Sequence, residues 1–182
     1  MSEPVADSPR KIGRNGTLLG LAATLVLSGV LLASTAGKER TAATILPAIT
    51  LTTLRNADQT INLADLRGTP LVINFFFSDC PPCLKELPLI ERVAKSTRSD
   101  VRFVGIDHGE ARSKGQSIAD RFGLDYTLLS DETASYAPQV GALAFPTTLF
   151  VDRQGQIVGR HLGAMTPNDL NSGLKVISHA IP

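Results

Sequence analysis

Leu71-Val-Ile-Asn-Phe-Phe-Phe-Ser-Asp-Cys-Pro-Pro-Cys83 is the segment from which the architecture of this chain is most readily inferred. Apart from one asparagine, its first seven residues are leucine, β-branched or aromatic, which predicts a buried strand. After Cys83, apolar residues recur at helical spacing with charged residues between them, which predicts an amphipathic helix over about 82–97. Cys80 and Cys83 are the only two cysteines of the chain, and they lie where the strand becomes the helix.

The position of this cysteine pair favours redox chemistry. Residues at i and i+3 on the first helical turn have Cβ atoms about 5 to 6 Å apart, so a disulfide closes with little backbone movement. The unpaired N–H groups and the dipole of a helix N-terminus favour an anion, which lowers the pKa of a cysteine there from about 8.5 toward neutrality. Pro81 suits the first helical position and biases Cys80 to an extended, cap-like backbone. We therefore expect Cys80 to be the nucleophile and Cys83 the resolving thiol.

Other interpretations of the pair remain open. A static structural disulfide would close a very short loop, which stabilises a domain of ordinary size poorly. Half of a zinc site is a second alternative, although zinc usually needs four ligands at recognisable spacing. A copper or zinc carrier would use both cysteines and one of His108, His161 and His179, but these histidines are scattered and we assign them no role. Peroxide reduction is weaker still, because Phe77, and not a threonine, lies three residues before Cys80.

The N-terminal region predicts export. Residues 17–36 hold no charge and make about 30 Å of helix, which matches the hydrocarbon thickness of a bilayer. Positive residues upstream predict that 1–16 is a cytoplasmic tail and that 17–36 is a single-pass anchor in the cell membrane. A cleaved signal peptide is the alternative, because Ser34-Thr35-Ala36 could serve as a cleavage site. Both interpretations place the remaining chain on the extracytoplasmic side.

The rest of the chain fits one globular domain. About 145 of the 182 residues remain, which is enough for a proper hydrophobic core. Basic and acidic residues beyond the tail balance at fifteen each, so no basic patch for nucleic acid emerges. Residues 37–48, rich in Ala and Thr, are predicted as a linker and 49–182 as the domain.

Strands and helices alternate through this domain, which predicts an α/β sandwich. Alternating residues at 49–54 and 61–63, separated by turn residues, predict an N-terminal β-hairpin. Further strands are expected at 71–77, 101–107, 126–129, 147–152 and 156–160. Helices are expected at 82–97 and 116–122, a helical turn or short helix at 132–139, and a last helix from about residue 166, with a polar loop at 108–115.

A second motif, Phe145-Pro146-Thr147, precedes a predicted strand and is followed by an Asp-x-x-Gly turn. Together with the cysteine pair and the terminal helix, it gives a pattern that resembles the thioredoxin fold over residues 49–180. The resemblance is specifically to the TlpA/ResA-like membrane-anchored thiol–disulfide oxidoreductases. The matching residues are Leu66-Arg67-Gly68, Asn74-Phe75, Cys80-Pro81-Pro82-Cys83, Glu86, Pro88, and Phe145-Pro146-Thr147-Thr148-Leu149-Phe150-Val151-Asp152 followed by Gly155.

The resemblance implies a central mixed sheet flanked by helices, with Pro146 and Glu86 beside the cysteines. Pro146 is expected to be cis and to lie against the pair, where its missing N–H leaves neighbouring backbone free to pair with a substrate strand. Glu86 is expected to be a buried or half-buried carboxylate that tunes the thiols and passes protons, whereas thioredoxin has an Asp at the position of Asn74. An ordinary solvated helix glutamate is the alternative for Glu86.

The resemblance also implies what binds near the pair. Pro81, Pro82, Ala144 and Phe145 are expected to contact the substrate, although Phe145 fits the core equally well. The expected substrates are disulfide-containing exported proteins, often apocytochrome c or its maturation factors. Electrons are expected from a membrane thiol transporter of the DsbD/CcdA type. Neither a cofactor nor a metal is expected.

Two positions depart from the family pattern, which usually has tryptophans where this chain has Phe76 and Asp79. A carboxylate next to the nucleophile opposes the thiolate, and Pro81 and Pro82 lack N–H donors that could otherwise reach the Cys80 sulfur. Both effects raise the pKa of Cys80. Because a less stabilised thiolate makes the couple more reducing, we expect a reductase and not an oxidase.

Overall fold

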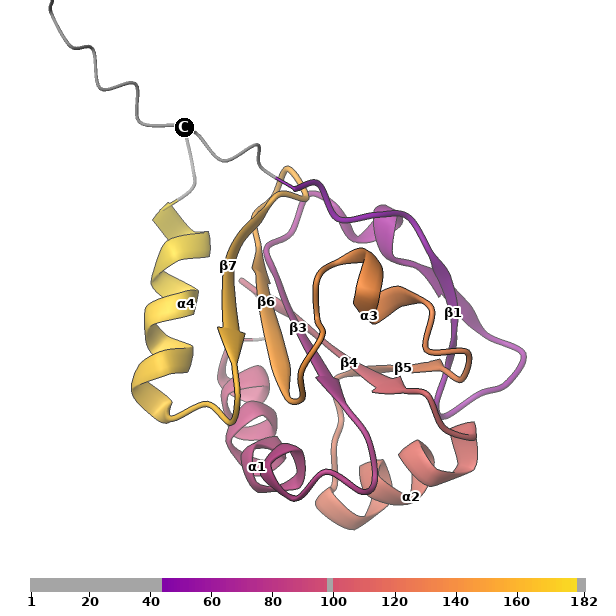
Figure 1. Ribbon diagram of the computed structural model, residues 1–182. Coiled ribbons are helices and arrows are strands. Elements are labelled where there is room, and N and C mark those ends of the chain that lie inside the picture. The colour runs from indigo at the N-terminus through magenta and orange to yellow at the C-terminus, as the bar shows by residue number, and fades with distance from the viewer. Residues whose placement is uncertain (1–43, 98–99, 180–182) are drawn as a thin grey trace, which may run out of the picture. The chain divides into compact units, whose positions relative to one another are not determined.

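A computed structural model describes residues 44–97 and 100–179 of the chain (Figure 1). The predicted cytoplasmic tail and membrane anchor, 1–16 and 17–36, lie outside the described residues. Within the part of the chain that the structure describes, no helix has both the length and the apolar character needed to cross a membrane.

The described residues form one mixed sheet with helices packed on it (Figure 1). The strands are β1 (Thr50–Thr53), β2 (Thr60–Asn62), β3 (Leu71–Phe76), β4 (Arg102–His108), β5 (Thr127–Asp131), β6 (Thr147–Val151) and β7 (Ile157–Leu162). The helices are α1 (Pro81–Ser96), α2 (Arg112–Phe122), α3 (Tyr136–Gln139) and α4 (Pro167–His179), together with the 3-10 helix η1 (Leu63–Leu66). The strand order is β2-β1-β5-β4-β3-β6-β7, with β3, β4 and β5 parallel and the other neighbours antiparallel. This confirms the predicted α/β class, the mixed sheet and the N-terminal hairpin.

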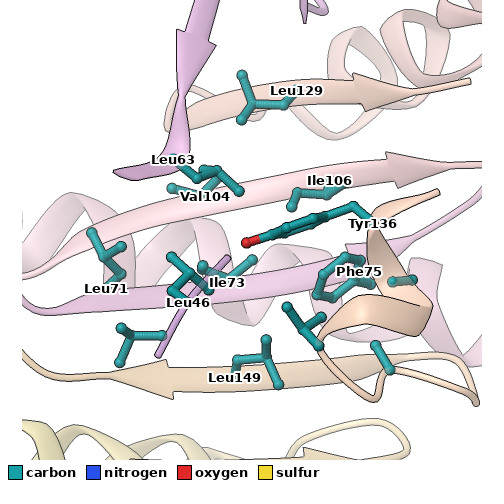
Figure 2. Packing of buried hydrophobic residues seen from close by; sticks show 14 of the residues in the cluster. Leu46, Leu63, Leu71, Ile73, Phe75, Val104, Ile106, Leu129, Tyr136 and Leu149 are labelled. Atoms are coloured by element: carbon teal, nitrogen blue, oxygen red, sulfur yellow. The ribbon is translucent and has the colours of Figure 1, made fainter. Parts of the chain in front are cut away.

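The central strand β3 is buried on both sides because its side chains alternate between two apolar layers. Ile73 and Phe75 pack on one face, where Tyr136 of α3 also lies (Figure 2). Val72 and Phe76 belong to the opposite layer, to which α1, α2 and α4 contribute their apolar residues. Because β3 is an interior strand, hydrogen-bonded to β4 on one edge and to β6 on the other, the cysteines that follow it are attached to a well-held strand.

Helix α2 begins earlier than the sequence predicts. We expected a polar loop over 108–115 and a helix from Gln116, but the helix begins at Arg112. The prediction is wrong because the first turn is polar and contains Gly115, and glycine is a weak helix former. Gly115 fits there because the buried carboxylate of Asp107 lies against it, and a Cβ at this position would collide with that carboxylate.

The predicted linker 37–48 is also partly wrong, because its described residues belong to the domain. Ile45 forms a bridge with Gln156, and Leu46 donates its N–H to the carbonyl of Gly155 at 2.8 Å. Leu46 is fully buried in the apolar layer that Figure 2 shows. Residues 44–48 therefore pack against the β6–β7 turn, although the Ala and Thr content of 37–48 predicts a linker.

Candidate active site

The cysteine pair lies at the start of α1, as the sequence predicts. Cys80 is the residue that caps the helix, Pro81 occupies the first helical position, and Cys83 lies on the first turn. The two cysteines form a disulfide, with sulfurs 1.93 Å and Cα atoms 5.2 Å apart. Cys80 is 4% exposed and Cys83 is fully buried, so of the two only Cys80 reaches the surface.

The structure weakens the prediction that the Cys80 sulfur lacks a backbone N–H donor. Although Pro81 and Pro82 lack an N–H, the backbone N–H of Cys83 donates a hydrogen bond to the Cys80 sulfur at 3.3 Å. The helix N-terminus therefore still supplies one donor to this sulfur. Asp79 is also a weaker opponent than expected, because its side chain is 87% exposed and lies 3.9 Å from the Lys114 ammonium.

Glu86 is a buried carboxylate held from two sides. One oxygen accepts a hydrogen bond from the Asn74 side chain at 2.8 Å, and the other accepts from the backbone N–H of Met165 at 2.7 Å. Its residue exposure is 2%, so the burial that the resemblance implies is confirmed and the alternative of a solvated glutamate is wrong. Burial raises the pKa of Glu86 above its ordinary value, and the hydrogen bonds from Met165 and Asn74 only partly offset this. Its part in proton transfer stays a prediction.

A row of polar side chains crosses three strands beside Glu86. Asn74 of β3 is in register with Thr148 of β6, which is in register with His161 of β7. The Asn74 amide donates to Thr148 at 3.0 Å as well as to Glu86. The charge of His161 favours the ionised form of Glu86 and so lowers its pKa. These contacts depend on strand register, which the sequence does not provide.

A cleft of about 300 Å³ reaches Glu86 between α1 and the segment that leads into α4. Its lining residues are Lys85, Glu86, Leu89, Arg92, Ala164, Met165, Thr166 and Pro167. The lining is therefore partly basic and partly apolar, and it includes the buried carboxylate of Glu86.

The loop before β6 has the features implied for Pro146. The Phe145–Pro146 peptide bond is cis, which confirms that prediction, and Pro146 is buried. Its carbonyl accepts a hydrogen bond from the N–H of Gly163 at 2.8 Å. Phe145 is half-buried and packs against the apolar cluster that contains Cys80 and Cys83, whereas Ala144, Pro81 and Pro82 are exposed. Substrate contact by these residues stays a prediction.

The loop between β4 and α2 also reaches the site, and sequence reasoning gave it no role. The Glu110 carboxylate accepts hydrogen bonds from the N–H of Ser78 at 2.7 Å and from its hydroxyl at 2.5 Å, and so holds the turn that leads to Cys80. Because β3 and β4 are parallel neighbours, the residues that follow them meet at one edge of the sheet. That rule is the signal that could have placed Glu110 and His108 near the cysteines.

Asp107 lies near the end of β4 and is fully buried. Among the described residues, neither of its carboxylate oxygens has a hydrogen-bond partner. Burial, and to a smaller extent the neighbouring Glu110 carboxylate, raises the pKa of Asp107 to about 9. Burial raises the pKa of Glu110, but the neighbouring Asp107 and the hydrogen bonds from Ser78 outweigh it, so the pKa of Glu110 is lowered. Asp107 is therefore protonated at neutral pH, while Glu110 stays charged.

In the part of the chain that the structure describes, no three His, Cys, Asp or Glu side chains are grouped so as to hold a metal ion.

Comparison with known proteins identifies the family. Residues 41–177 match the Redoxin family. The chain belongs to this family. The thiol-disulfide oxidoreductase ResA of Halalkalibacterium halodurans is 28% identical over 120 residues, which cover 65% of this chain and 68% of that protein. The thioredoxin-like protein YneN of Bacillus subtilis is 27% identical over 116 residues, which cover 62% and 68%.

Solved structures agree with this assignment. A secreted Mycobacterium tuberculosis disulfide oxidoreductase homologous to DsbE of E. coli has a TM-score of 0.61 and 28% identity, over 70% of this chain and 94% of that one. A thioredoxin-family thiol:disulfide interchange protein from Chlorobium tepidum has a TM-score of 0.64 and 24% identity, over 73% and 94%, and supports the fold alone. The Redoxin protein described here is thus a ResA-like thiol–disulfide oxidoreductase of the thioredoxin superfamily.

Proposed function

We propose that this Redoxin protein is an extracytoplasmic protein-disulfide reductase. The observation that carries the proposal is the unequal burial of the pair at the start of α1, where Cys80 keeps an exposed fraction and Cys83 is enclosed. A nucleophile must be reached by a substrate disulfide, whereas a resolving thiol only has to reach the nucleophile. Cys80 and Cys83 meet these two requirements in that order.

The proposed reaction has two exchanges. The Cys80 thiolate attacks one sulfur of the substrate disulfide, so a Cys80–substrate bond forms, the substrate S–S bond breaks, and the released thiolate takes a proton from solvent. Cys83 then loses its proton and attacks the Cys80 sulfur. The Cys80–Cys83 bond forms, and the second substrate thiolate leaves and is protonated. Two electrons have passed from the enzyme dithiol, which ends oxidised, to the substrate disulfide.

Glu86 is the proposed acceptor of the Cys83 proton. It lies three residues after Cys83 on the same helix, so the two are neighbours on one face of α1. A raised pKa suits a buried acid for proton exchange near neutral pH, and the cleft beside it gives solvent a route to the carboxylate.

Phe145 is the proposed pairing residue for the substrate backbone. Since the Pro146 carbonyl already accepts from Gly163, the backbone available to a substrate strand lies on the N-terminal side of Pro146. The exposed Ala144 and the half-buried Phe145 flank that backbone.

The reductase direction is supported by the surroundings of the sulfurs. Apolar burial of both cysteines disfavours the charged thiolate, and Asp79 acts in the same direction, whereas the Cys83 N–H acts against them. We expect the equilibrium with glutathione to give a potential near that of thioredoxin, about −270 mV. A value near about −120 mV, typical of a strong oxidant, contradicts this direction.

The proposed location and partners follow from the sequence and the resemblance. Residues 17–36 support a membrane anchor with the domain on the extracytoplasmic side. A DsbD/CcdA-type transporter is the proposed electron donor. Disulfides of exported proteins, apocytochrome c among them, are the proposed substrates.

Covalent trapping tests the proposal. With Cys83→Ser the second exchange cannot occur, so mixed disulfides between Cys80 and substrates should accumulate in cells and should vanish on treatment with a reductant. Cys80→Ser is the matched control, because it removes the attacking sulfur and should trap nothing. Absence of adducts with Cys83→Ser, or equal adducts with both variants, contradicts the mechanism.

A further inference from the structure

His108 is the last residue of β4, and its ring is a direct neighbour of the proposed substrate loop. The imidazole stacks on the Phe145 ring, with centroids 4.6 Å apart and planes inclined by 29°. The side chain is 17% exposed, so most of it is packed. This residue has no part in the thiol chemistry described above.

The stack continues toward the cysteines. The other contact of Phe145 is with the Phe77 ring, at 5.5 Å between centroids and 82° between planes. Phe77 follows β3 and precedes the turn to Cys80, and Phe145 precedes Pro146. The three rings of His108, Phe145 and Phe77, here called the aromatic column, therefore join the ends of β4 and β3 to the loop before β6. Phe77 and Phe145 both pack against the cluster that contains both cysteines.

The imidazole acts in this column as a neutral ring. The charged group that faces it is Asp131 on the neighbouring strand β5, at 3.7 Å from Nδ1, which is beyond hydrogen-bond distance. The Asp131 oxygens already accept from the backbone N–H groups of Ser135 at 3.1 Å and Tyr136 at 2.9 Å. Burial lowers the pKa of His108, and the attraction of Asp131 offsets this only in part.

We propose that His108 is a positioning residue for substrate binding: its neutral ring holds Phe145 against Phe77 and so fixes the backbone on the N-terminal side of Pro146 that receives the substrate strand. The inference rests on the proposed function, because it concerns the docking of a protein disulfide. It assigns His108 no contact with the reacting sulfurs. Loss of the ring should therefore weaken substrate binding and leave the redox equilibrium unchanged.

The test compares His108→Ala and His108→Phe with the wild type, with insulin as the disulfide substrate and a small dithiol as the reductant that regenerates the enzyme dithiol. His108→Ala should raise KM about two- to tenfold, the size expected for one lost aromatic contact, at constant kcat and constant equilibrium with glutathione. His108→Phe keeps a stacking ring and should restore KM. In the wild type KM should also rise as acid charges the imidazole, whose pKa burial lowers, whereas His108→Phe should show no such rise.

Two further measurements separate the possible failures. Ile177→Ala, at a buried residue of α4, controls for general destabilisation and should leave KM unchanged. Affinity for an oxidised insulin-derived peptide, measured on protein with Cys80→Ser and Cys83→Ser, should fall by the same factor with His108→Ala and does not require turnover. Wild-type protein that binds the peptide but does not reduce insulin contradicts the proposed function alone. An unchanged KM or affinity with His108→Ala, or no recovery with His108→Phe, overturns the role of His108.

Discussion

Glu86 is a buried acid whose two oxygens are held by donors from outside its own helix, the Asn74 side chain and the Met165 backbone. Turning this carboxylate toward solvent would break both hydrogen bonds, so its position relative to α1 is fixed. Burial still raises its pKa, so it exchanges a proton nearer to neutral pH than a surface glutamate does. The two hydrogen bonds therefore fix the position of the carboxylate and also limit the rise in its pKa that burial causes.

Glu86→Gln should slow the second exchange, because an amide cannot accept the Cys83 proton. We expect kcat/KM at neutral pH to fall by about tenfold or more, and the rise in rate that accompanies Glu86 ionisation above pH 4.5 to disappear. Stopped-flow measurement of the resolution step between pH 4 and 8 gives both quantities. Glu132→Gln, at an exposed glutamate, is the control. A variant with the wild-type pH profile contradicts the proton-transfer role.

The site residues that could be predicted from the sequence are those that lie within one local motif. Cys80, Cys83 and Glu86 lie within one turn-and-helix segment, so spacing and resemblance were enough to select them. The donors to Glu86 come from β3 and from the segment before α4, and His108 meets Phe145 only through the fold. Contacts over such sequence separations depend on strand order and register, and a single sequence leaves both undetermined.

Among the elements, the long apolar strands were predicted correctly, whereas the polar start of α2 and the packing of 44–48 were not. Strands β3 and β4 are buried in the sheet, so their composition alone identifies them. The first turn of α2 is polar and contains a glycine that accommodates Asp107. The segment 44–48 is short and lies beside the β6–β7 turn, where contact with a distant part of the chain decides its structure.

The segment before β1 should contribute to stability as a part of the core. Leu46→Ala removes a fully buried side chain and should lower the free energy of unfolding by about 2 to 5 kcal/mol. Urea denaturation measures this difference. Ile45→Ala is a matched control one residue away, because Ile45 is 46% exposed and should cost much less. Equal effects of the two substitutions would show that 44–48 is not packed in the core.

For the molecule as a whole, a protonated Asp107 makes stability depend on pH. Its pKa is about 9 in the folded protein, against an ordinary value of 3.8, so the folded state keeps a proton that the unfolded state has lost. Stability from this group is therefore fully present below pH 3.8 and declines as pH rises toward 9, by at most about 1.4 kcal/mol per pH unit.

Asp107→Asn should remove this dependence, since an amide does not ionise. The variant should become increasingly more stable than the wild type as pH rises from 4 to 8, and denaturation curves at several pH values measure the difference. Asp120→Asn, at a side chain that is 62% exposed, should give an almost constant difference. A constant difference for Asp107→Asn as well would mean that Asp107 is ionised in the folded protein at neutral pH.

Cys80, Phe145 and Pro146 are not among the residues that line the cleft beside Glu86. Thiol–disulfide exchange at Cys80 and proton exchange at Glu86 would thus use different parts of the surface. A bulky partner docked over the nucleophile could seal that surface completely while water still reached the acid from the flank of the helix. In the proposed mechanism, the Cys83 proton could then leave through the cleft beside Glu86 even while a large substrate covers Cys80.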